Sequence, residues 1–123
     1  MMSTSIRYIV DDVDDAIEFY RDRLGFAVTM HPAPGFAALR RDDLVLLLNA
    51  PGAGGAGTAG GNPAPGGWNR FQIQTADLDG LVSKLRDQGV TFRGDLVKGG
   101  GGRQILVEDP AGNVIELFEP ASG

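Results

Sequence analysis

The chain repeats one order of predicted elements twice, and this repetition limits the fold more than any other feature of its 123 residues. Residues 12–25 and residues 77–89 each place apolar side chains on one helical stripe, with an aspartate in front and a glycine behind. The pattern therefore predicts two amphipathic helices of the same design. The stripe and boundary residues are Asp12, Val13, Ala16, Ile17, Tyr20, Leu24 and Gly25, then Asp77, Leu78, Leu81, Val82, Leu85 and Gly89.

Strand-like segments surround both predicted helices in the same order. One alternating segment precedes each helix, and three short β-rich segments follow it, separated by turn residues. The sequence is therefore predicted to fold as an α+β protein of two tandem βαβββ modules. The strands are predicted at residues 5–10, 26–30, 35–40 and 44–49 in the first module and at 68–75, 90–97, 103–108 and 113–119 in the second.

A segment rich in Gly and Pro, residues 50–67, connects the first module (4–49) to the second (68–120). It contains a Gly-x-Gly-x-x-Gly pattern, but no helix follows, and a dinucleotide-binding loop must open a helix. The segment is therefore interpreted as a surface connection. The glycines of the pattern are Gly52, Gly54 and Gly57. A second glycine run, residues 99–103, is interpreted as a hairpin loop before a strand rather than a phosphate-binding nest.

Composition excludes several classes of function. The longest apolar run is far shorter than the roughly 18 residues of a membrane helix, so no membrane partner is expected. The absence of cysteine excludes disulfides and thiol chemistry and fits the cytoplasm. A net charge of -5 disfavours nucleic acid as a partner. The one histidine, His31, precedes Pro32 at a predicted turn and is interpreted as a loop residue, because it lacks the orienting partners of a catalytic triad.

The duplicated layout, the segment DVDDAIEFYRDRLGF after the first strand and the C-terminal segment EDPAGNVIELFEP resemble the glyoxalase, bleomycin-resistance and extradiol-dioxygenase superfamily, also called vicinal oxygen chelate. The resemblance covers nearly the whole chain apart from the linker. It implies a single domain, residues 1–123, whose two curved mixed sheets enclose a cleft with the helices outside, and it implies a homodimer. For metal-using members it implies a divalent ion bound by two histidines and one or two carboxylates.

Only one of the implied metal-ligand positions retains a metal ligand in this sequence. The two histidine positions precede the helix caps by seven residues and hold Ser5 and Arg70. The optional ligand position in the first module falls near Leu47, and the last carboxylate position is Glu116. Because a guanidinium stays protonated and has no lone pair for a metal, neither a metal site nor a cofactor is expected.

Strand alternation places polar side chains on one face of each predicted sheet. Alternation alone predicts a solvated sheet surface, whereas the resemblance implies that this face lines a cleft. Arg70 and Glu116 are expected to pair there, either as a cross-link that replaces the metal or as part of a ligand site. The candidate ligand-binding residues are Ser5, Arg7, Leu47, Trp68, Arg70, Gln72, Val114, Glu116 and Phe118.

These residues support two hypotheses from different classes. The first is a metal-free protein that sequesters or carries a small aromatic or cationic compound between Trp68, Phe118 and Glu116. The second is a lyase or isomerase in which Glu116 acts as general acid or base and Arg70 stabilises a developing charge. Binding is favoured because no titratable group besides Glu116 is predicted on the inward faces to share proton transfers. A metal-dependent glyoxalase or dioxygenase is the third hypothesis.

Overall fold

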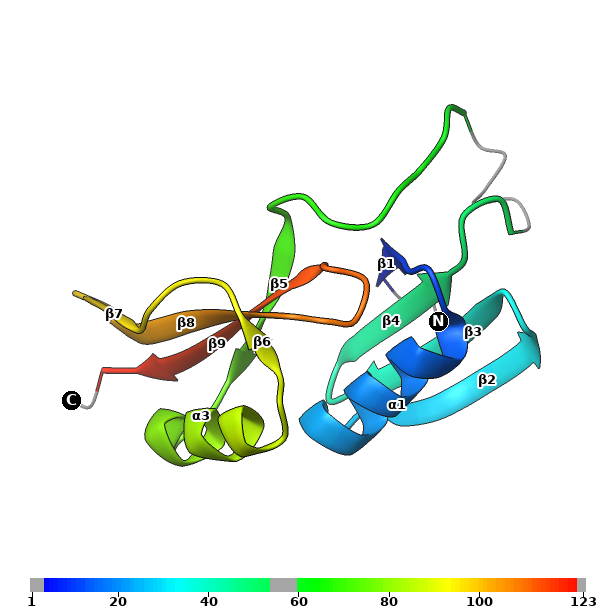
Figure 1. Cartoon of the computed structure of the whole chain (residues 1–123). Coiled ribbons are helices and arrows are strands. Elements are labelled where there is room, and N and C mark those ends of the chain that lie inside the picture. The colour runs from blue at the N-terminus through cyan, green and yellow to red at the C-terminus, as the bar shows by residue number, and fades with distance from the viewer. Residues whose placement is uncertain (1–3, 54–59, 122–123) are drawn as a thin grey trace. The chain divides into compact units, whose positions relative to one another are not determined.

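Residues 4–53 and 60–121 are described by a computed structural model, in which the chain divides into two units, Met1–Gly66 and Gly67–Gly123 (Figure 1). Each unit contains a helix that follows the first strand of a mixed sheet. The predicted α+β class with two tandem βαβββ modules is therefore confirmed. Two of the three glycines in the Gly-x-Gly-x-x-Gly pattern, Gly54 and Gly57, lie outside the described residues. No helix in the described ranges is long and apolar enough to cross a membrane.

The first unit packs helix α1 (Val13–Leu24) against a four-stranded sheet. The helix begins at Asp12, whose carboxylate accepts the backbone N–H of Asp15, and it ends at Gly25 in the left-handed conformation. Both predicted boundaries are confirmed. The sheet order is β1-β4-β3-β2, in which only β1 and β4 run parallel. Its strands are β1 (Ser5–Ile9), β2 (Ala27–Ala33), β3 (Phe36–Arg41) and β4 (Leu44–Asn49).

The turn predicted at His31 and Pro32 is wrong, because both residues belong to β2. This strand pairs only with β3, so it is the edge of its sheet, where a proline does not remove a ladder hydrogen bond. The imidazole Nε2 of His31 lies 3.8 Å from Oδ1 of Asp14 on α1. His31 therefore lies beside the helix rather than in a loop.

The second unit packs helix α3 (Leu78–Asp87) against a five-stranded sheet. The carboxylate of Asp77 accepts the N–H of Gly80, which confirms the predicted cap. The strand order is β5-β9-β8-β6, with β7 paired to β8, and only β5 and β9 run parallel. The strands are β5 (Arg70–Gln74), β6 (Thr91–Phe92), β7 (Val97–Gly99), β8 (Gly102–Glu108) and β9 (Val114–Pro120).

The single strand predicted at residues 90–97 is wrong, since the chain forms two short strands, β6 and β7, in this region. Gly94 lies between them with a φ of 91°, a conformation that β-strands do not adopt. The hairpin predicted at residues 99–103 is present, because Gly99 pairs with Gly102 across β7 and β8. Because of this interruption, Arg93 directly follows the end of β6. Its side chain contributes to the site described below.

Candidate functional site

One face of the second sheet brings the predicted polar residues together. The parallel register of β5 and β9 pairs Arg70 with Val114, Gln72 with Glu116, and Gln74 with Phe118. Because paired residues point to the same side of a sheet, all six side chains lie on one face, here called the polar face. The alternate residues lie on the opposite face, which α3 covers, and they are buried. They are Phe71, Ile73, Ile115 and Leu117.

Both carboxylate oxygens of Glu116 accept hydrogen bonds on the polar face. Arg70 Nε donates to Oε1 at 3.0 Å, and Gln72 Nε2 donates to Oε2 at 2.6 Å. Gln74 Nε2 in turn donates to Gln72 Oε1 at 3.3 Å. The Glu116 side chain is 12% exposed and that of Arg70 is 32% exposed. A ligand that approaches this face therefore meets the guanidinium and the amides before it meets the carboxylate.

A second ion pair lies on the same face. The antiparallel register pairs Glu108 with Val114, so the Glu108 side chain is on the side of Glu116. Glu108 Oε2 accepts a hydrogen bond from Arg93 Nε at 2.9 Å. The prediction that no titratable group besides Glu116 lies on this face to share proton transfers is therefore wrong.

A signal for Glu108 exists in the sequence. Within residues 103–108, Ile105 and Val107 alternate with Leu106 and Glu108, which assigns Glu108 to the face opposite the core. Sequence reasoning missed the residue because it compared the strands that begin and end each module, and β8 lies between them. The position of Arg93 had no such signal, since it depends on the break after β6.

The Arg93 guanidinium is fixed by three hydrogen bonds and stacks on an indole ring. Besides Glu108, it donates to the carbonyl oxygens of Gly67 at 2.7 Å and Gly112 at 3.1 Å. Its central carbon lies 4.5 Å from the centroid of the Trp68 ring. Trp68 is nevertheless 67% exposed. One ring face therefore rests on a fixed cation while most of the indole remains accessible.

The candidate residues of the first unit share a face of their own sheet. The register pairs Ser5 with Val45 and Arg7 with Leu47, so Ser5, Arg7 and Leu47 point to the same side. Buried Leu46 and Leu48 point to the other side. The structure thus brings three predicted residues together in the first unit and groups the other six in the second.

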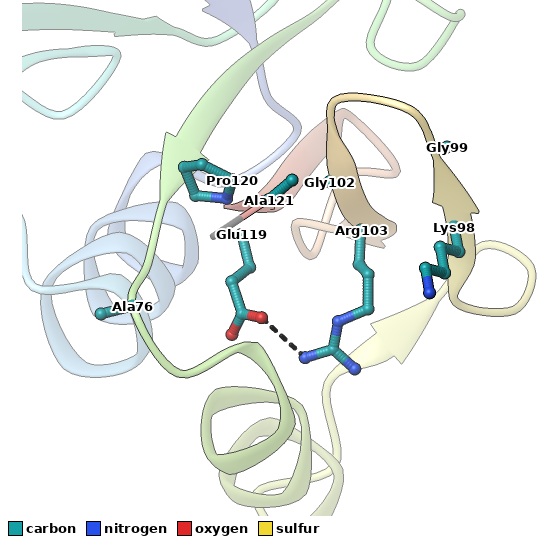
Figure 2. Close-up of a pocket in the computed structure, with 8 residues that line it drawn as sticks. All are labelled: Ala76, Lys98, Gly99, Gly102, Arg103, Glu119, Pro120 and Ala121. Carbon is teal, nitrogen blue, oxygen red and sulfur yellow. Dashed lines mark hydrogen bonds and ion pairs between the residues drawn. The ribbon is translucent and has the colours of Figure 1, made fainter. Parts of the chain in front are cut away.

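A separate cavity of about 730 Å³ lies on the other side of the second sheet (Figure 2). Arg103 pairs with Glu119 and Lys98 pairs with Arg103, which places all three side chains on the side of α3, away from Glu116. Sequence reasoning missed this cavity. The lining residues are Ala76, Lys98, Gly99, Gly102, Arg103, Glu119, Pro120 and Ala121.

An ion-pair network fixes the charged side chains of this cavity. Glu119 Oε1 accepts the backbone N–H of Leu78 at 2.9 Å, and Oε2 accepts Arg103 Nη2 at 2.9 Å. The Leu78 N–H, followed by Arg103, lowers the pKa of the Glu119 carboxyl below its ordinary value. Hydrogen bonds to Asp79 and Glu119 raise the pKa of Arg103. Both groups therefore remain charged at neutral pH.

The fold is a mixed α+β chain of two βαβββ units, and the last strand of the second unit carries the carboxylate of the polar face. The sequence comparison agrees, because residues 4–117 match the Glyoxalase/Bleomycin resistance protein/Dioxygenase superfamily. The chain belongs to this superfamily. No functionally curated protein matches it in sequence.

Solved structures of the same superfamily are similar to the chain over nearly its full length. A superfamily member from Sphaerobacter thermophilus DSM 20745 shares 27% identity, with 97% of each chain covered and a TM-score of 0.78. TnmS3, an antibiotic binding protein from Streptomyces sp. CB03234, shares 26% identity over 98% of this chain and 97% of its own, with a TM-score of 0.73. Lactoylglutathione lyase from Agrobacterium tumefaciens shares 22% identity over 97% of this chain and 92% of its own, with a TM-score of 0.73. At this identity, the similarity shows the shared fold alone.

The residues on the polar face do not fit the metal ion that some members of this superfamily use. The Arg70 guanidinium, at a position where the resemblance implies a histidine, donates to Glu116, whose second oxygen accepts from Gln72. A protonated guanidinium repels a cation and cannot ligate it. Across residues 4–53 and 60–121, no group of three or more His, Cys, Asp or Glu side chains is placed to hold a metal.

Proposed function

We propose that the protein binds a small planar aromatic compound on the polar face of the second unit without a metal. The observation that carries this proposal is the stack of Trp68 on Arg93. Three hydrogen bonds fix the guanidinium, so the indole rests on a rigid support and loses little freedom when a ligand stacks on it. Offset stacking between aromatic rings adds about 0.5 to 1.5 kcal/mol beyond the burial of area.

The hydrogen bonds of the polar face favour a neutral ligand with acceptor oxygens over a cationic one. Glu116 and Glu108 are each paired with an arginine, so each carboxylate charge is balanced within the face. Arg70 donates its Nε–H to Glu116 and one Nη1–H to the Trp68 carbonyl oxygen at 3.5 Å. Its remaining guanidinium N–H groups are free to donate to a ligand. A ring carbonyl or hydroxyl oxygen matches these donors.

The relatives support a binding role within the superfamily. TnmS3, which is similar over nearly its full length, is an antibiotic binding protein. We extend to this chain only the class of ligand, a small organic molecule. We further propose that the protein acts in the cytoplasm as a homodimer, in keeping with its cysteine-free composition and small size.

A lyase or isomerase is the second candidate function, and Glu108 favours it. Two carboxylates on one face, Glu108 and Glu116, supply the pair of groups that acid and base steps require. Glu116 would then move the proton and Arg70 would stabilise the developing charge. Catalysis requires one carboxylate to release its arginine when the substrate binds, whereas binding leaves both ion pairs intact.

Nuclear magnetic resonance tests the binding proposal, because the chain has one tryptophan and therefore one indole N–H signal. The probes share a naphthalene ring: 2-naphthamide is neutral, naphthalene-2-carboxylate is anionic and 2-naphthylmethylammonium is cationic. We expect a saturable shift of the indole signal with 2-naphthamide and binding of the ammonium at least about fivefold weaker, roughly 1 kcal/mol. Absence of a saturable shift with all three probes would refute the proposal, and a preference for the ammonium would refute the charge argument.

A further inference from the structure

We propose that the cavity of Figure 2 is a second binding site, which takes a small molecule bearing a carboxylate or phosphate group. The site lies on the α3 side of the sheet, whereas Glu116 lies on the other side. It is therefore separate from the polar face, and the proposal does not depend on the function proposed above.

The walls of the cavity leave room for the body of a ligand. Five of the eight lining residues are glycine, alanine or proline, whose side chains are too small to fill the space. The volume, about 730 Å³, falls in the range of roughly 300 to 1,000 Å³ of small-molecule sites. The small residues are Ala76, Gly99, Gly102, Pro120 and Ala121. An inorganic ion alone would leave most of this volume unused.

Arg103 is held in place and still has hydrogen-bond donors for an anion. Its Nη1 donates to Asp79 Oδ1 at 3.2 Å, and its Nη2 donates to Asp79 Oδ2 at 3.3 Å and to Glu119 Oε2 at 2.9 Å. A guanidinium has five N–H donors, so these three bonds leave the Nε–H and one Nη1–H. The two acids fix the guanidinium without using its full capacity.

Lys98 supplies a second cation to the same cavity. Figure 2 shows its side chain and that of Arg103 extending from neighbouring strands in the same direction, with Glu119 on the far side of the guanidinium. Among the described residues, the Lys98 ammonium has no ion pair within 4 Å. Because it lacks an ion pair there, this ammonium is available to bind an anion from solution.

The acids beside the cavity do not cancel its preference for anions. One carboxylate oxygen of Glu119 accepts a hydrogen bond from the Leu78 N–H, at the positive end of α3, and the other accepts one from Arg103. Both carboxylate oxygens of Asp79, on the first turn of α3, accept hydrogen bonds from Arg103. The unused N–H donors of Lys98 and Arg103 therefore remain for a ligand, while both acids are already paired with donors. A carboxylate or phosphate accepts from both at once.

The chain has two lysines, Lys84 and Lys98, which allows a direct test. Reductive methylation with ¹³C-formaldehyde gives each lysine a dimethylamino signal, and Lys84, which does not line the cavity, is the internal control. The probes are phenyl phosphate, benzoate, inorganic phosphate and neutral benzamide. We expect phenyl phosphate and benzoate to shift the Lys98 signal saturably. Inorganic phosphate should bind at least about fivefold more weakly, because it leaves most of the cavity empty.

Two variants make the test specific to the cavity. Ala121→Leu places a larger side chain at an exposed lining position and keeps Lys98, so we expect it to weaken phenyl phosphate binding at least about fivefold. Calorimetry on unmethylated protein compares Lys98→Met with Lys84→Met, which removes the same charge elsewhere, and only Lys98→Met should weaken binding. Equal shifts of both lysine signals, linear shifts with every anion, or unchanged binding in Ala121→Leu would each overturn the proposal.

Discussion

Both carboxylate oxygens of Glu116 accept hydrogen bonds, one from Arg70, with which pairing was expected, and one from Gln72. Its charge is therefore balanced within the polar face. In the proposed binding function, Glu116 contributes by holding the Arg70 and Gln72 side chains in position.

The substitution Glu116→Gln tests this role. The new amide keeps the shape of the side chain but presents a donor to Arg70 or Gln72, so one hydrogen bond is lost. We expect the free energy of unfolding to fall by no more than about 1 to 2 kcal/mol. The affinity for 2-naphthamide should fall about tenfold, because the two donors lose their fixed positions. Chemical denaturation and the indole titration measure the two effects.

The opposite outcome has its own signature. If Glu116 only balances Arg70, Glu116→Gln leaves the cation unpaired and destabilises the fold by roughly 3 kcal/mol or more. An Arg70→Met, Glu116→Leu double variant then regains stability. A stable double variant that binds 2-naphthamide as well as the unmodified protein would show that Glu116 and Arg70 have no role in binding.

Arg93 offers a second test at the same scale, with a matched control in the same unit. Arg93→Ala removes the support beneath Trp68 and should weaken 2-naphthamide binding about five- to tenfold, or roughly 1 to 1.4 kcal/mol. Arg86 also lies 4.5 Å from an aromatic centroid, that of Phe92, so Arg86→Ala removes a similar contact away from Trp68. Equal losses in both variants, or a loss that follows the melting temperature, would contradict a specific role for Arg93.

At the scale of secondary-structure elements, one ionised side chain connects β9 to the start of α3. Glu119 on β9 accepts the N–H of Leu78, the first residue of α3, and it also pairs with Arg103 of β8. The helix start is thus tied to the end of the sheet by a carboxylate whose pKa is lowered mainly by that N–H.

This link predicts a pH dependence of stability. Because the pKa of Glu119 is lower in the folded chain, its stabilising contribution is complete above the ordinary glutamate pKa of about 4.3 and is lost as pH falls through the lowered value. Glu119→Gln should therefore destabilise the protein at pH 7, and the difference from the unmodified protein should shrink toward pH 3. Denaturation at several pH values checks this, with Glu18→Gln on the exposed side of α1 as the control. A difference that does not change with pH would contradict the role of the ionised form.

The elements also show what sequence can and cannot predict here. Helix boundaries were predictable because Asp12 and Gly25 act locally, through a cap and a left-handed turn. The pairing of Arg70 with Glu116 was predictable because alternation assigns each to a polar face and the superfamily resemblance implies that these faces meet. The position of Arg93 was not, since it follows from a strand break and from contacts with Gly67 and Gly112, both distant in sequence. The Figure 2 cavity was not predictable either, because the register of three strands defines it.

At the scale of the whole molecule, the superfamily resemblance predicts a homodimer. A single chain of 12.9 kDa is small, and pairing helps to enclose a binding site. Sedimentation at micromolar concentration should show a species of about twice the chain mass. A single species at the mass of one chain, with undiminished binding of 2-naphthamide, would refute this prediction.

The last prediction concerns metal. The resemblance implies histidines at the positions of Ser5 and Arg70, and Arg70 is hydrogen-bonded to Glu116. Elemental analysis of protein purified without added metal should therefore find no stoichiometric zinc, nickel, iron or manganese, and a chelator should leave the melting temperature unchanged. Tight metal binding by the unmodified protein would contradict this prediction and show that the ligands lie elsewhere in the chain.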